Sequence, residues 1–172
     1  MMAVIEAIAT TYLEADAASV TVSSLGSYEH LQIRMSTRST VDDLHDMVKI
    51  NLNSDTGSNY SRHYMTSRSS STSAGGQTGV AMTKGGWVPA SQDFQAPFYG
   101  ATTVGIYDYR NANKNTTVLW NVGGRYSGGA NIYMVSGLWD STAAVTSIAL
   151  AMVTGPNFGR GSEFTLYGLN SS

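Results

Sequence analysis

The densest group of side chains that could perform chemistry lies in residues 42–46 (DDLHD), where three carboxylates flank an imidazole. Such groups bind divalent metals, and a His–Asp pair acts as a general base. A zinc site takes ligands from several elements, however, and the other two histidines, His30 and His63, have no comparable cluster around them. We therefore favour a solvated turn whose acidic residues lie near a helix N-terminus, with a metal site or a general base as the alternative.

A second oxygen-rich segment is residues 53–59 (NSDTGSN), between two predicted strands. Carboxylate and carbonyl oxygens on loops are the ligands that calcium prefers. The segment contains a single acid and does not have the spacing of an EF-hand. A tight turn with Gly57 at positive φ is the favoured interpretation, and a calcium loop is the alternative.

The motifs of common enzymes are missing from this sequence. There is no Gly-x-Ser-x-Gly elbow, and the glycine-rich residues 74–79 (AGGQTG) lack the lysine of a phosphate-binding loop. The chain has no Cys, which excludes a disulfide, a thiolate metal site and a thiolate nucleophile. No pair of acids is distinguished as in a glycosidase. We expect a protein that is not an enzyme, with no cofactor and no metal.

The composition limits the class of protein. The 172 residues are 42% hydrophobic and 13% charged, with a formal net charge of −2, whereas average soluble domains are roughly 25% charged. The sequence has no apolar run long enough for a transmembrane helix and too many apolar residues for a disordered chain. The few Lys and Arg are scattered singly, so we expect no nucleic-acid partner and no membrane partner.

Short runs of alternating apolar and polar residues indicate strands that bury one face. In residues 28–35, for example, Leu31, Ile33 and Met35 alternate with polar side chains. The runs predict an all-β fold, an antiparallel β-sandwich of about nine or ten strands. The expected strands are residues 19–24, 28–35, 47–53, 59–66, 78–83, 101–109, 116–122, 130–136, 146–153 and 164–168.

Two further segments are predicted to be loops. Residues 67–76 (SRSSSTSAGG) contain only small or polar side chains and Arg68, and we expect a mobile loop tip. Residues 87–99 are rich in aromatic side chains and are predicted to form a long loop that either binds a partner or packs over one end of the core. Aromatic rings stack on sugars and anchor protein interfaces, which makes Trp87, Phe94, Tyr99 and Trp139 candidate interaction residues.

The domain organisation is predicted to be a short N-terminal arm, residues 1–11, followed by a single β-sandwich domain, residues 12–172. The arm is apolar and nearly uncharged. Its side chains Val4, Ile5 and Ile8 are candidates for contact with a neighbouring subunit, on which the arm would become ordered. The alternative is a frayed chain end.

Several segments, taken in order, resemble small β-sandwich structural proteins of tailed bacteriophages, of the head-decoration and fibre types. The resemblance covers roughly residues 12–169. The segments that carry it are residues 26–34 (GSYEHLQIR), 53–60 (NSDTGSNY), 136–139 (SGLW), 142–148 (TAAVTSI) and 161–168 (GSEFTLYG).

The resemblance implies a jelly-roll domain in the virion without catalytic residues. Because few residues precede the first of these segments, no fibrous shaft is expected, and a capsid decoration (cement) protein fits better than a fibre. The implied partners are the major capsid protein and further copies of the chain in a homotrimer, on the capsid surface, after synthesis in the host cytoplasm. The alternative is a receptor-binding tip module of a fibre that binds a host surface glycan. A neutral surface suits an assembly, since few charges lose water on contact.

Overall fold

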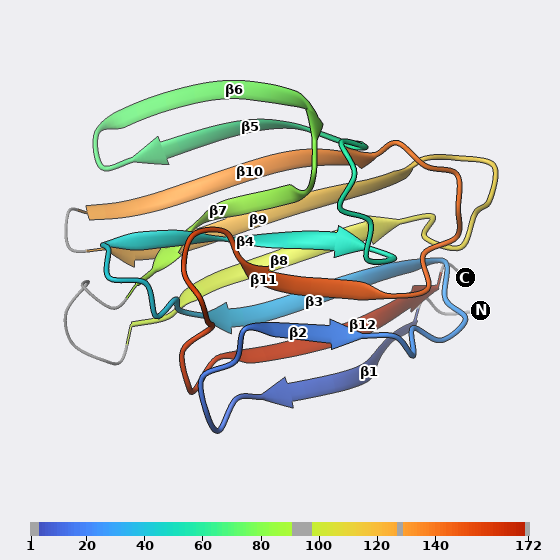
Figure 1. Ribbon diagram of the computed structural model, residues 1–172, viewed down its shortest axis with the longest axis horizontal. Coiled ribbons are helices and arrows are strands. Elements are labelled where there is room, and N and C mark those ends of the chain that lie inside the picture. The colour runs from blue at the N-terminus through green and yellow to red at the C-terminus, as the bar shows by residue number, and fades with distance from the viewer. Residues whose placement is uncertain (1–3, 91–97, 127–128, 171–172) are drawn as a thin grey trace.

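The computed structural model describes residues 4–90, 98–126 and 129–170. These residues form twelve strands in two antiparallel sheets, which confirms the predicted all-β sandwich. Figure 1 shows the two sheets as layers, the larger one extending beyond the smaller at both edges. No helix in this part of the chain is long and apolar enough to cross a membrane.

The large sheet has eight strands and the small sheet has four. In spatial order the large sheet comprises β1 (Val4–Tyr12), β12 (Glu163–Asn170), β3 (His30–Thr37), β8 (Gly100–Tyr107), β9 (Thr116–Tyr126), β10 (Gly129–Trp139), β5 (Tyr60–Arg68) and β6 (Ser71–Val80). The small sheet comprises β2 (Ser19–Val22), β11 (Ile148–Met152), β4 (His45–Leu52) and β7 (Thr83–Pro89).

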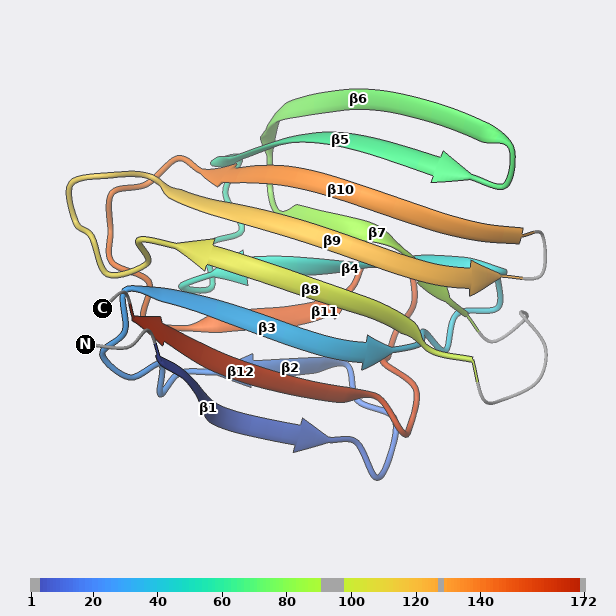
Figure 2. The ribbon, with the colours of Figure 1, turned by 180° about the vertical axis from the view of Figure 1, so that it is seen from behind.

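The strand order contains a complete jelly roll with two inserted hairpins. When β5–β6 and β9–β10 are set aside, the sheets read β1-β12-β3-β8 and β2-β11-β4-β7. These eight strands in two four-stranded antiparallel sheets have the jelly-roll arrangement, which the resemblance implies. Both hairpins join the large sheet after β8, in the order β9, β10, β5 and β6, as Figure 2 shows from the other side.

The core lies between the two sheets and follows the predicted alternation. Leu31 and Ile33 of β3 and Ile50 of β4 belong to this core, and each is almost completely buried. Trp120 of β9 is the largest fully buried side chain among the described residues. Burial of each such side chain contributes roughly 1.5–3 kcal/mol to folding, which is ample for a domain without disulfides.

The predicted strand count of nine or ten is lower than the twelve observed, for two reasons. First, residues 4–12, most of which were expected to be an arm, form the edge strand β1. This strand pairs with β12 from Val4 opposite Asn170 to Tyr12 opposite Glu163. Second, the run predicted at residues 78–83 spans the end of β6 and the start of β7.

The prediction of a mobile loop tip at residues 67–76 is wrong. The chain turns at Ser69, whose φ is +50°, and returns as β6, with Arg68 opposite Ser71 and Met65 opposite Ala74. A strand at the edge of a sheet is stabilised by backbone hydrogen bonds to its neighbour, so it forms here without an apolar face.

The tight turn predicted in residues 53–59 exists, but Gly57 does not have positive φ. Asn53 and Ser54 do, at +53° and +57°, and the Asp55 N–H donates to the Leu52 carbonyl at 2.9 Å. Two central residues with positive φ define a type I′ turn, for which Asn is well suited. The turn therefore comprises residues 52–55, and Gly57 lies beyond it.

Candidate functional site

The β5–β6 hairpin extends past β7, the edge strand of the small sheet, so its inner face is only partly covered (Figure 1). A cavity of about 190 Å³ lies there, between the two sheets, and we call it the cleft. The large sheet contributes most of the lining of the cleft. Strands β4 and β7 of the small sheet contribute the rest. The lining residues are Arg62, Tyr64, Thr66, Arg68, Ser73 and Tyr133 from the large sheet, with Met47 and Trp87 from the small sheet.

Alternation along β5 places the polar lining residues on one face. Because successive side chains point to opposite faces, Arg62, Tyr64, Thr66 and Arg68 all lie on the inner face, which is the face of the core. Thr66 is opposite Tyr133 of β10. The inward-facing side chains of β5 thus begin with Tyr60 in the hydrophobic core and continue toward the hairpin turn with Arg62 and Arg68.

A bulge in β7 brings Trp87 to the cleft. Met47 is opposite Trp87 and Lys49 is opposite Lys84, so Gly85 and Gly86 together face a single residue of β4. A side chain at Gly86 would overlap the Tyr133 ring, and one at Gly85 would contact the ring of Trp120. The two glycines therefore allow β7 to pass directly against the large sheet.

The half-buried Trp87 ring is held by several contacts. Its centroid is 3.5 Å from that of His45 and 6.0 Å from that of Tyr133. The guanidinium carbon of Arg68 lies 4.1 Å from the ring centroid, a cation–π contact. The Trp87 carbonyl accepts a hydrogen bond from Asn131 Nδ2 at 3.0 Å. Trp87 is thus fixed by contacts to β4, β5 and β10.

Two cationic side chains, Arg62 and Arg68, line the cleft, and Lys84 lies on a nearby strand. Burial is the main cause that lowers the pKa of Arg62. Burial also lowers the pKa of Lys84 on the facing strand, and the positive charge of Arg62 lowers it further. Among the described residues, no carboxylate oxygen lies within 4 Å of the charged nitrogens of Arg62, Arg68 or Lys84. Such an uncompensated group of cations is suited to attract an anion.

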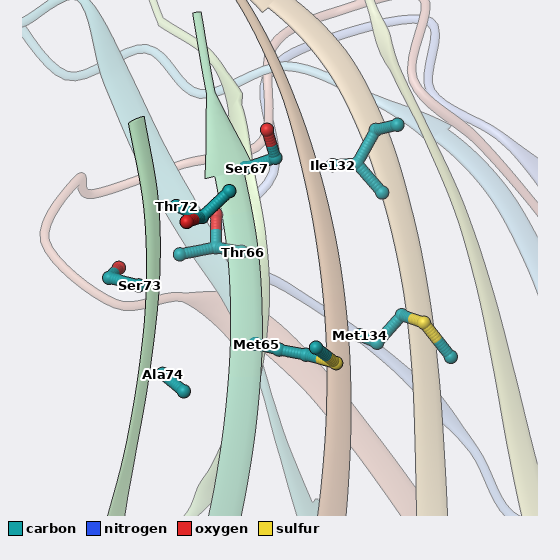
Figure 3. Close-up of a pocket in the computed structure, with 8 residues that line it drawn as sticks. All are labelled: Met65, Thr66, Ser67, Thr72, Ser73, Ala74, Ile132 and Met134. Atoms are coloured by element: carbon teal, nitrogen blue, oxygen red, sulfur yellow. The ribbon is translucent and has the colours of Figure 1, made fainter. Parts of the chain in front are cut away.

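The opposite face of the large sheet carries three exposed apolar side chains where β5 pairs with β10. We call Met65 of β5 with Ile132 and Met134 of β10 the outer apolar patch. These side chains are 61%, 64% and 50% exposed, and Met65 is directly opposite Met134 (Figure 3). They border a shallow depression of about 380 Å³. No ionisable side chain lines it, and the rest of its lining is Thr66, Ser67, Thr72, Ser73 and Ala74 (Figure 3).

The N-terminal candidates lie at the other edge of the large sheet. Val4 and Ile5 of β1 are 51% and 56% exposed, whereas Ile8 lies at a bulge and packs partly against the core. The large sheet therefore carries exposed apolar side chains at both edges, near β1 and near β6.

The four aromatic candidates do not gather at one site. Trp87 lines the cleft, whereas Trp139 is buried in the core and donates from Nε1 to Asp55 Oδ2 at 2.7 Å. The Tyr99 hydroxyl donates to the carbonyl of Arg160 at 2.7 Å. Phe94 lies outside the described residues. Of the expected aromatic loop, residues 87–89 belong to the end of β7, and residues 91–97 lie outside the described residues.

The acidic segment 42–46 forms a bend and the start of β4, with its carboxylates apart. Asp42 and Asp43 are exposed, whereas Asp46 is buried. Asp46 accepts hydrogen bonds from Ser39 Oγ and from the backbone N–H groups of Met47, Thr154 and Gly155. In the part of the chain that the structure describes, no three His, Cys, Asp or Glu side chains group as metal ligands. Asp46 therefore has a structural role.

The polar residues of the cleft are not among the candidates predicted from the sequence. The signal was nevertheless present, because Arg62 and Arg68 share the alternation of Tyr60 and so belong to the core face of their strand. A cation on such a face indicates a partner of opposite charge or a polar cavity.

No family model, no curated protein and no solved structure matches this chain. The jelly-roll arrangement is therefore established by the strand connections themselves. The cleft and the outer apolar patch are the two surface features from which a function can be inferred.

Proposed function

We propose that this protein is a structural protein of a phage virion, a capsid decoration protein that binds the outer shell and stabilises it through protein–protein contacts. The observation that carries the proposal is the outer apolar patch, where three large apolar side chains are at least half exposed without an ionisable neighbour in the depression. Contiguous apolar surface of this kind is typical of protein interfaces, and Met side chains adapt to a partner of irregular shape.

The position of the exposed apolar groups supports a cross-linking role. One group lies near the β6 edge of the large sheet, and Val4 and Ile5 lie on the β1 edge. A single copy can therefore contact two neighbours, either two capsid subunits or one capsid subunit and another copy of the chain. A protein that binds the assembled shell, and not the separate capsid subunits, shifts the assembly equilibrium toward the shell and so stabilises it. We propose a homotrimer as the bound form.

The fold and the composition agree with this role. Jelly rolls are common in viral capsid domains, although they also serve many other functions, so this support is by analogy. Only 13% of the residues are charged, which keeps the desolvation cost of a large contact low.

The experiment is co-sedimentation of the purified chain with capsids that lack it, followed by imaging of the decorated particles. We expect hundreds of copies on the shell, whereas about a dozen copies at the tail would support the fibre alternative. The triple variant Met65→Ser, Ile132→Ser and Met134→Ser removes the outer apolar patch from an exposed surface. It should sediment with capsids at least about tenfold less well.

The matched control is Tyr107→Ser, which truncates a 40% exposed apolar side chain elsewhere on the large sheet. The control should bind as the unmodified chain does. Binding of the triple variant at full affinity would contradict the proposed contact surface.

The receptor-binding alternative is favoured by one feature, the aromatic and cationic lining of the cleft. Trp139 is buried and does not face a surface ligand, so Trp87 is the tryptophan available to this role. A glycan array on which binding is lost with Trp87→Leu, while the capsid assay is negative, would favour this alternative.

A further inference from the structure

The cleft contains a buried guanidinium whose partners among the described residues are all neutral. Arg62 is 8% exposed. Its Nε donates to Gln77 Oε1 at 3.0 Å and its Nη1 donates to the Lys84 carbonyl at 3.3 Å, while its guanidinium carbon lies 5.1 Å from the Tyr64 ring centroid. A guanidinium has five N–H groups, so donors remain for a further acceptor. A buried charge without a counter-charge is costly, and an anion in the cleft offsets that cost.

The second observation is a buried hydroxyl beside this cation. Thr66 is 7% exposed, and its Oγ1 has no hydrogen-bond partner among the described residues. Thr66 lies between Arg62 and Arg68 on the same face of β5 and lines the cleft with them. Other buried threonines, such as Thr37 and Thr83, also lack a partner, but they do not line the cleft. Thr66 thus provides an unused donor next to two cations.

We propose that the cleft binds an oxyanion, a carboxylate or phosphate group, through the Arg62 guanidinium and the Thr66 hydroxyl, with Arg68 at its rim. The guanidinium supplies parallel N–H donors that match two oxygens of such a group. Tyr133 and Met47 provide apolar surface for the carbon atoms that carry it. The cavity of about 190 Å³ is small, which suits a terminal acidic group or a single acidic sugar. This proposal does not depend on where the protein lies in a virion.

The test is a binding titration of the full chain with inorganic phosphate, glucuronate and neutral glucose, monitored by calorimetry and by Trp fluorescence at constant ionic strength. Phosphate represents the free ion and glucuronate represents a carboxylate on a sugar. We expect saturable binding of at least one of the two anions and none of glucose. Absence of binding by both anions at millimolar concentration, or equal binding of glucose, would overturn the proposal.

Three variants locate the binding. Arg62→Gln and Arg68→Gln each remove a cation, and Thr66→Val removes the hydroxyl while it keeps the shape of the side chain. We expect about a tenfold or greater loss of anion affinity for Arg62→Gln and roughly a fivefold loss for Thr66→Val. Should Arg62→Gln fail to fold, as judged by circular dichroism, Arg68→Gln and Thr66→Val still decide the question. Unchanged affinity in both would place the anion elsewhere.

The matched control is Arg34→Gln. Arg34 of β3 has similar neutral partners, since its Nε donates to Gln32 Oε1 at 2.8 Å and its guanidinium carbon lies 4.8 Å from the ring centroid of Tyr167. It is exposed, however, and does not line the cleft. Anion affinity should be unchanged in this variant. An equal loss in Arg34→Gln and Arg62→Gln would show that the anion responds to overall charge and would overturn the assignment.

Discussion

Gly86 of β7 lies directly against the ring of Tyr133 of β10, and any side chain at this position would overlap the ring. The contact joins β7 of the small sheet to β10 of the large sheet, beside the cleft that Tyr133 lines. The absence of a Cβ on one strand therefore determines how closely the two sheets approach here, and with it the position of Trp87.

The first prediction concerns this approach. Gly86→Ala should lower the free energy of unfolding by about 2–3 kcal/mol, because either the Tyr133 ring or β7 must move. The control is Gly123→Ala in β9, where an added Cβ meets no atom within 4 Å. This control should be neutral or stabilising by about 0.5 kcal/mol. Urea denaturation of both variants measures the difference, and equal stabilities would contradict the packing described.

The second prediction concerns pH. Hydrogen bonds from Asn59, Trp139 and the Gly57 N–H lower the pKa of the Asp55 carboxyl below its ordinary value of 3.8. A folded-state pKa below the unfolded one gives a stabilisation that is complete above the unfolded pKa and is lost as pH falls through the folded pKa. Stability should therefore decline below about pH 4. In Asp55→Asn this part of the decline should be absent, as measured by thermal melts from pH 7 to pH 2.

The third prediction concerns the buried Asp46. Its two oxygens accept four hydrogen bonds, one from Ser39 Oγ and three from backbone N–H groups. In Asp46→Asn one oxygen becomes an amide that is itself a donor, so at least one buried donor loses its acceptor. We expect a loss of roughly 3 kcal/mol in the free energy of unfolding, measured by urea denaturation. The exposed Asp43→Asn is the control and should change stability by less than about 0.5 kcal/mol.

The fourth prediction concerns the edge strand β1. It pairs with β12 on one side only, and most of its side chains are exposed. Its amide protons should exchange roughly a hundredfold faster than those of β3, which lies between β12 and β8. Hydrogen exchange measured by mass spectrometry or NMR checks this. Equal protection of the two strands would show that β1 unfolds only with the whole domain.

The fifth prediction concerns Thr66 in the absence of any anion. Its buried hydroxyl has no partner among the described residues, so its desolvation is not offset. Thr66→Val should raise the free energy of unfolding by about 1 kcal/mol in a buffer without phosphate or carboxylate. A loss of stability would mean that the hydroxyl is satisfied in the unliganded protein.

The strands with one clearly buried face could be predicted from sequence. Ile50 and Leu52 of β4, for instance, alternate with polar residues because one side of the strand faces the core and the other faces water. Strand β6 could not be found in this way. Its small and polar side chains show no buried face, and backbone pairing with β5 accounts for its formation.

The candidate site was harder to predict for a different reason. The cleft combines Arg62 of β5 with Trp87 of β7, and their proximity depends on the inserted hairpin and on the bulge at Gly85 and Gly86. Alternation reveals which face of a strand is buried but not which strand lies opposite. The aromatic candidate Trp139 illustrates the same limit, since its type suggested a surface role and its strand places it in the core.

The free edge of β6 has a consequence for how the protein behaves at high concentration. Its ten residues include no charged side chain and no Pro, the usual features that prevent another strand from adding to an open edge. An extended segment of almost any sequence can therefore hydrogen bond along it and lengthen the sheet. Concentrated solutions should accordingly be prone to ordered aggregation that begins at this hairpin, and a single lysine introduced at Thr78 of β6 would be a simple means of keeping the protein soluble.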